Sequence, residues 1–173
     1  MTTIIDTQLP APGRCYLDPD ATTVDFATRH LFGLAPVRGT MPVLSGAVHV
    51  GDPIGTSLVQ VELDAAGFAT GNQQRDAMVR GPRYLDSDAH PTLTFTADGP
   101  VRDETGWRLD GTLTVQGVSR PGRLRITRVS ADGDAFVVDA ETRVDRLAFG
   151  ITATRGMAAR YLRVSVHARI VRD

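Results

Sequence analysis

The side chains best suited to chemistry are His30 and two adjacent charged pairs, Arg75–Asp76 and Asp145–Arg146. A histidine can donate a hydrogen bond to a ligand, and an arginine can bind a phosphate group through two parallel hydrogen bonds. The same residues have a structural interpretation. His30 could satisfy backbone groups where a strand ends, and each charged pair could be an ion pair that holds a helix or a corner in place. The sequence leaves both interpretations open.

Familiar catalytic and cofactor motifs are absent from the chain. The four histidines, at positions 30, 49, 90 and 167, are isolated from one another and match no metal-ligand spacing, so we expect no metal site. There is no Gly-x-Ser-x-Gly motif and no glycine-rich phosphate loop. Cys15 lacks the flanking pattern of a catalytic thiol, and a chain without lysine cannot form a Schiff base. We therefore predict no catalytic residue and no cofactor.

Composition indicates one ordinary globular domain. The chain has 173 residues, 42% of them hydrophobic, with a net charge of −1. A nearly neutral chain has no overall field to attract a polyanion, so we predict no nucleic-acid partner. The outward arginines at 123, 125, 163 and 169 are read as a solvated face.

Period-two alternation of apolar and polar residues is the main structural signal, and it predicts antiparallel strands. It covers about eight segments: 15–17, 24–26, 59–65, 93–95, 107–115, 124–126, 136–144 and 162–170. Strands in this number suit a closed barrel, which has no exposed edges. Residues 1–13 are predicted to be a flexible lead-in and residues 14–173 the barrel domain. One or two short helices are expected between strands, a turn over 30–36 and a helix over 72–80 that ends at Gly81-Pro82.

Five short segments, in order and in register, connect the sequence with a known family. They are Val24–His30, Arg75-Asp76, His90–Phe95, Gly111–Val118 and Asp145–Ile151. Together they resemble the YceI-like family of lipocalin-like, polyisoprenoid-binding proteins over residues 14–171. The resemblance implies an all-β, antiparallel lipocalin-like barrel with a long apolar cavity. It also implies binding and sequestration of an amphiphilic isoprenoid, a polyprenyl chain or a quinone tail, whose head His30 or a nearby arginine would hold.

The cavity is expected to be lined by apolar residues from several strands and from the segment after the second strand. The candidates are Phe26, Leu31, Phe32, Phe95, Leu113, Phe149 and Ile151, with Met78, Leu85 and Met157 at the mouth. Position 78 departs from the family, in which an Arg-Asp-x-His-Leu segment often stands where this chain has Arg75-Asp76-Ala77-Met78-Val79. The head-group end of the ligand could therefore differ from that of relatives.

Two other functions stay open at this point. The barrel could be an isomerase or cyclase for a hydrophobic substrate, with His30 and Asp145 as an acid/base pair. It could instead be packed throughout and serve as a protein-interaction module, which would leave no cavity. The first twelve residues do not resemble a secretory signal and no stretch approaches 18 apolar residues, so we expect a cytoplasmic protein without membrane insertion, either a monomer or a homodimer.

Overall fold

The computed structural model describes residues 9–30, 35–153 and 159–173. Within them the chain forms one α-helix, α1 (Gln73–Arg80), and three short 3₁₀ turns, η1 (Ile54–Thr56), η2 (Ala65–Gly67) and η3 (Arg146–Phe149). The strands are β1 (Gly13–Leu17), β2 (Thr23–His30), β3 (Ala35–Thr40), β4 (Val43–Val50), β5 (Leu58–Asp64), β6 (Thr92–Asp98), β7 (Val101–Asp103), β8 (Gly106–Val115), β9 (Val118–Asp132), β10 (Ala135–Asp145) and β11 (Tyr161–Arg172).

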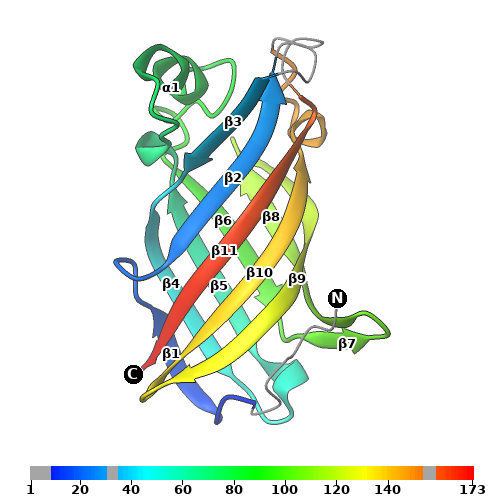
Figure 1. The fold of residues 1–173 in the computed structure, drawn as a ribbon. Coiled ribbons are helices and arrows are strands. Elements are labelled where there is room, and N and C mark those ends of the chain that lie inside the picture. Colours follow the sequence, from blue (N-terminus) through cyan, green and yellow to red (C-terminus); the bar gives the residue numbers. More distant parts are fainter. Residues whose placement is uncertain (1–8, 31–34, 154–158) are drawn as a thin grey trace.

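The strands close into an antiparallel barrel (Figure 1). Neighbouring strands follow the order β1-β4-β5-β6-β8-β9-β10-β11, and β11 pairs back with β1, which closes a ring of eight. The first half of β11 pairs with β2 instead, and β2 pairs with β3, so these two strands continue the wall above β1 and β4. The prediction of an all-β barrel of about eight strands is confirmed.

Alternation in the sequence sets which side chains face the interior. In the β10–β11 ladder, Val138 lies opposite Ala168 and Ala140 opposite Val166, and these residues point inward. The intervening pairs, such as Asp139 with His167, point outward. Because the side-chain period of a strand is two, one apolar row per strand is enough to line a barrel.

The segment between β2 and β4 corrects one prediction. A helical turn was expected over 30–36, but His30 ends β2 and pairs with Ala35, while Pro36 pairs with Arg29. Pro36 is the second residue of β3, which lies at the end of the strand order, and an edge strand tolerates a residue without an N–H group. Residues 31–34 lie outside the described residues. The predicted helix over 72–80 is confirmed as α1, with the Asn72 side chain accepting a hydrogen bond from the Arg75 N–H as its N-cap.

Buried apolar side chains form two clusters, one at each end of the barrel. The upper cluster, near α1, consists of Phe26, Met41, Ala65, Phe68, Tyr84, Leu85, Leu93, Val115, Phe149 and Ile151. The lower cluster consists of Cys15, Leu17, Val24, Val43, Val48, Val50, Phe136, Ala168 and Ile170. Between the two clusters, the side chains that face the middle of the barrel are only half-buried.

Candidate functional site

The barrel contains an apolar cavity of about 870 Å³. Its walls include Val59, Val61, Phe95 and Leu113, which face inward yet are only partly buried. An inward side chain of a closed barrel can be partly exposed only to space inside the barrel. The accessible surface of these residues therefore belongs to the cavity, and the volume lies within the usual range for small-molecule sites.

Phe26 comes from β2 and reaches the cavity from the upper cluster. Its ring stacks on Phe68 with centroids 4.9 Å apart and planes at 13°. Gly39 on β3 makes this stack feasible, because a Cβ atom there would lie 2.5 Å from Phe26 Cζ. The stack holds the Phe26 ring as a fixed part of the cavity wall.

Phe95 and Leu113 lie directly opposite each other on β6 and β8, and both line the cavity. Gly111 leaves space for the Phe95 ring, since a Cβ atom at position 111 would lie 2.8 Å from Phe95 Cζ. Gly122, across from Gly111 on β9, differs from it. Its Cβ position has only ordinary contacts, 3.6 Å to Phe95 Cε2 and 3.7 Å to Leu113 Cβ, so the missing side chain there leaves open cavity.

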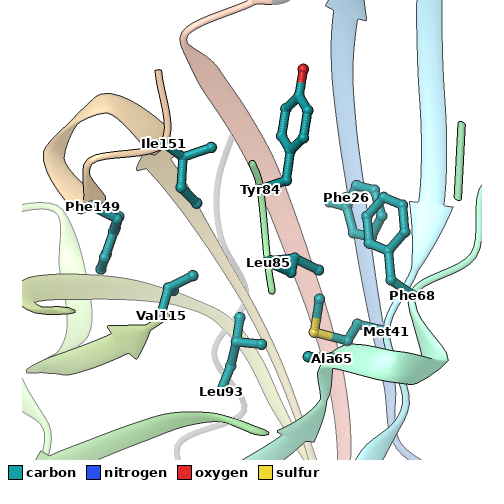
Figure 2. Packing of buried hydrophobic residues seen from close by; sticks show 10 residues of the cluster. All are labelled: Phe26, Met41, Ala65, Phe68, Tyr84, Leu85, Leu93, Val115, Phe149 and Ile151. Atoms are coloured by element: carbon teal, nitrogen blue, oxygen red, sulfur yellow. The ribbon is translucent and has the colours of Figure 1, made fainter. Parts of the chain in front are cut away.

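Leu85, Phe149 and Ile151 lie in the upper cluster and line the cavity from above (Figure 2). They come from the segment after α1, from η3 and from the second residue after η3, respectively. Met78 also lines the cavity from α1, and its side chain is 48% exposed, as expected of a residue at a mouth. The side chain of His30 and the residues Leu31, Phe32 and Met157 lie outside the described residues.

Arg75 and Asp76 take part in a hydrogen-bond network that attaches α1 to the chain before it. The buried Asp76 carboxylate accepts hydrogen bonds from the Thr70 N–H at 3.0 and 3.1 Å and from the Thr70 hydroxyl at 2.5 Å. Arg75 Nε in turn donates to the Thr70 hydroxyl at 2.8 Å. Hydrogen bonding from Thr70 lowers the pKa of Asp76. Arg75 also borders the cavity.

Asp145 and Arg146 contact different partners instead of pairing with each other. Asp145 pairs with Arg160 at 2.7 Å and caps η3 by accepting from the Leu147 N–H, and hydrogen bonding from Arg160 lowers its pKa. Arg146 is only 7% exposed, and its guanidinium donates to three backbone carbonyl groups. These belong to Ile151 at 2.9 Å, Ala153 at 2.8 Å and Ala159 at 2.9 Å. Both residues thus hold the corner that follows β10.

The lower end of the cavity contains residues that the sequence did not single out as ligand contacts. Trp107 on β8 lines it, with the Arg102 guanidinium 5.8 Å from the centre of its ring. Leu9 and Pro10 line it as well, from the segment before β1. The sequence did contain a signal for Trp107, because this residue begins the inward apolar row that also contains Leu113. No pattern in the sequence indicated Leu9 or Pro10.

Two further features are absent from the described residues. No three His, Cys, Asp or Glu side chains among them gather closely enough to hold a metal ion. None of the helices in the described part of the chain has the length and apolar character needed to cross a membrane.

Comparisons with known proteins agree with the barrel fold. A family profile described as the YceI-like domain matches residues 16–171. A UPF0312 protein of Pectobacterium carotovorum is 24% identical over 156 residues, 87% of this chain and 81% of that protein. Burkholderia cenocepacia BcnA superimposes with a TM-score of 0.76 at 19% identity, over 90% of this chain and 99% of that one. A domain from Saccharophagus degradans, described as polyisoprenoid-binding and implicated in plant cell wall breakdown, superimposes with a TM-score of 0.71 at 16% identity, over 92% and 98% of the two chains.

Proposed function

Since the chain belongs to the YceI-like domain family, we propose that it binds the apolar chain of an isoprenoid lipid inside its barrel and sequesters it from water. The observation that carries the proposal is the apolar cavity of about 870 Å³ between the two end clusters. The polyisoprenoid-binding description of the Saccharophagus domain supports the same ligand class.

The energetics of such a complex are favourable. Each buried CH₂ group contributes about 0.8 kcal/mol, so a five-carbon isoprene unit contributes about 4 kcal/mol before the cost of ordering the chain. Immobilising the ligand opposes this by several kcal/mol, so binding needs more than one unit inside the barrel. A long cavity with few polar atoms suits a repeating hydrocarbon better than a compact polar metabolite.

Trp107 provides a direct assay. It is the only tryptophan of the chain and lines the lower end of the cavity, so insertion of an isoprenoid tail changes its fluorescence. Titration with geranylgeraniol should give a saturable change, and native mass spectrometry of the same sample should show a one-to-one adduct. Absence of both signals, at ligand concentrations up to its solubility, would rule out the proposed function.

A cavity-filling variant tests where the tail binds. Gly122→Phe places a ring in the cavity without backbone strain, and we expect at least tenfold weaker binding of geranylgeraniol. Thr112→Phe is the matched control, because Thr112 lies on the adjoining strand and is exposed on the outer wall. Equal affinities of the two variants would place the tail outside the barrel.

The alternatives from the sequence receive different support. The packed barrel predicted no cavity, which the cavity described above argues against. No arrangement of the described residues favours the isomerase or cyclase, because Asp145 is engaged by Arg160 and by η3. A cytoplasmic location and a homodimer remain predictions, which cell fractionation and analytical ultracentrifugation test.

A further inference from the structure

The barrel wall has a gap between β9 and β10 in its upper half. The ladder between these strands ends at the pair Arg125–Glu141. Beyond it, residues 118–124 of β9 pair with β8, while residues 142–145 of β10 pair with β11. Between them the ring of backbone hydrogen bonds is interrupted.

A proline accompanies the end of the pairing. Four residues before Arg125 on β9 stands Pro121, which has no N–H group to donate to a neighbouring strand. A continued register would also place Arg123 opposite Arg143, but the wall accepts such pairs elsewhere, since Arg143 lies opposite Arg163. Pro121 is therefore the sequence feature that favours an end to the ladder at this place.

The cavity reaches the gap. Pro121, Arg123 and Arg143 have the outward register of their strands, yet all three border the cavity. Outward residues of the continuous ladders, such as Thr112, Asp139 and Arg163, do not border it. The cavity therefore has a side opening, which we call the β9–β10 portal and define by Arg120, Pro121, Arg123, Thr142 and Arg143.

Two of its arginines carry positive charge without a carboxylate partner among the described residues. Arg120 has the inward register of β9, opposite Leu113, and donates to the Ser119 carbonyl oxygen at 2.9 Å. Arg143 lies over the Tyr161 ring at 4.2 Å. Arg123, in contrast, is paired with Asp110 at 2.7 Å. Glu141 lies at the lower end of the portal, where the β9–β10 ladder stops.

We propose that the β9–β10 portal binds the phosphate or pyrophosphate head of the isoprenoid, with Arg120 contacting it from the cavity side and Arg143 from the outer side, while the tail fills the cavity. This inference rests on the proposed function. Guanidinium groups bind phosphate oxygens through paired, charge-assisted hydrogen bonds, and the portal gives a charged head access to water. The inward Thr142 hydroxyl adds a neutral donor beside them.

The test compares geranylgeranyl phosphate with geranylgeraniol, two ligands with the same tail. Affinities are measured by Trp107 fluorescence and isothermal titration calorimetry for the wild type and for Arg120→Gln, Arg143→Gln and the double variant. We expect the wild type to prefer the phosphate, and the double variant to lose at least tenfold in phosphate affinity while its affinity for the alcohol changes less than twofold.

Two arginine variants serve as controls. Arg38→Gln removes an exposed arginine of β3, a strand that pairs with neither β9 nor β10, and Arg38 does not border the cavity, so both affinities should stay unchanged. Arg75→Gln tests a different position for the head group, the mouth of the cavity beside α1. A loss of phosphate affinity in Arg75→Gln with none in the double variant would overturn the portal as the head-group site.

The remaining outcomes separate this inference from the proposed function. Binding of the alcohol with no preference for the phosphate would overturn the portal alone. Binding of inorganic phosphate as tightly as geranylgeranyl phosphate would show a free anion site and not a head-group site. Binding of neither prenyl ligand would overturn the proposed function, and the portal inference with it.

Discussion

At the scale of single residues, the role of each arginine in this protein depends on the groups that it contacts. Arg146 is buried and directs its guanidinium at backbone carbonyl groups, which a short corner leaves without strand partners. Arg120 and Arg143 stand beside an opening and have no carboxylate partner among the described residues. A buried, fully engaged arginine stabilises the fold, whereas one at an opening is available to a ligand.

Replacing Arg146 by methionine should destabilise the protein strongly. The variant removes three hydrogen bonds and leaves buried carbonyl groups unsatisfied, which costs about 2–4 kcal/mol. The free energy of unfolding from urea denaturation measures the loss. Arg128→Met, at an exposed position of β9, is the control and should change stability by less than about 0.5 kcal/mol. Equal stability of the two variants would contradict the role given to Arg146.

At the scale of secondary-structure elements, charged side chains on the outer wall connect adjacent strands. Asp103 of β7 pairs with Arg108 of β8 at 2.7 Å and with Arg125 of β9 at 3.0 Å. Asp110 pairs with Arg108 and Arg123. The outward arginines at 123 and 125, read from the sequence as a solvated face, are thus ion-paired. The Thr105 hydroxyl hydrogen bond, followed by that from Arg125, holds the pKa of Asp103 far below its ordinary value.

Because of this network, the stability of the folded protein depends on pH in the acidic range. The pKa of Asp103 is lower in the folded than in the unfolded state, so its stabilising contribution is present above the unfolded pKa of about 4 and is lost as the pH falls below it. Asp103→Asn should therefore be less stable than wild type at pH 7 and lose less stability between pH 5 and pH 2. Thermal unfolding across this pH range tests both points. The control is Asp134→Asn, an exposed turn residue without an ion pair among those described; a wild-type pH profile for Asp103→Asn would refute the argument.

The Asp76 carboxylate is one of the contacts that attach the helix α1, beside Arg80, whose guanidinium donates to the Phe68 carbonyl oxygen. Asp76→Ala leaves the Thr70 N–H and hydroxyl without their acceptor, at a cost of about 1–3 kcal/mol. We expect amide hydrogen exchange to accelerate over residues 70–80 and to stay unchanged in β9 and β10. Asp88→Ala, at an exposed position after the helix, should show no such acceleration. Unchanged exchange in the Asp76 variant would mean that other contacts hold the helix.

At the scale of the whole molecule, the protein is a hollow barrel with a packed cluster at each end. The backbone ladder and the end clusters maintain the fold, and the middle contributes less packing than a filled core would. A ligand that fills the middle adds the missing apolar contacts. Because it binds only the folded state, it must also raise stability.

A saturating isoprenoid should therefore raise the melting temperature. At one hundred times the dissociation constant the gain is about 2.7 kcal/mol, which for a chain of this size corresponds to a shift of about 5–10 °C. Differential scanning fluorimetry with geranylgeraniol measures it. Gly122→Phe should shift far less at the same ligand concentration, since its cavity is partly filled. Equal shifts in both proteins would indicate binding to the outer surface.

Much of the architecture could be predicted from the sequence. Alternating rows such as the one from Trp107 to Val115 determine which face of a strand is apolar, and eight such rows indicate a barrel. Asn72 and Gly81 set the limits of α1. The rows were harder to see where proline, glycine and exposed apolar residues interrupt them. The strands β3, β4 and the short β7 were therefore missed, and a helical turn was expected over 30–36. Phe95 and Leu113 were chosen as lining residues because an inward apolar row is readable from local spacing, whereas Phe149, in the turn η3, came from a segment that resembles the family.

What the tertiary structure decided concerns contacts between distant segments. Whether an inward residue packs or borders open space depends on the residue opposite, as the contrast between Gly111 and Gly122 shows. The partner of Asp145 is Arg160, fifteen residues away, and not its neighbour Arg146. The β9–β10 portal arises from the register of two strands, although Pro121 and the inward position of Arg120 were visible hints. Spacing along a strand determines which face a residue occupies, but only the closure of the barrel determines what lies across from it.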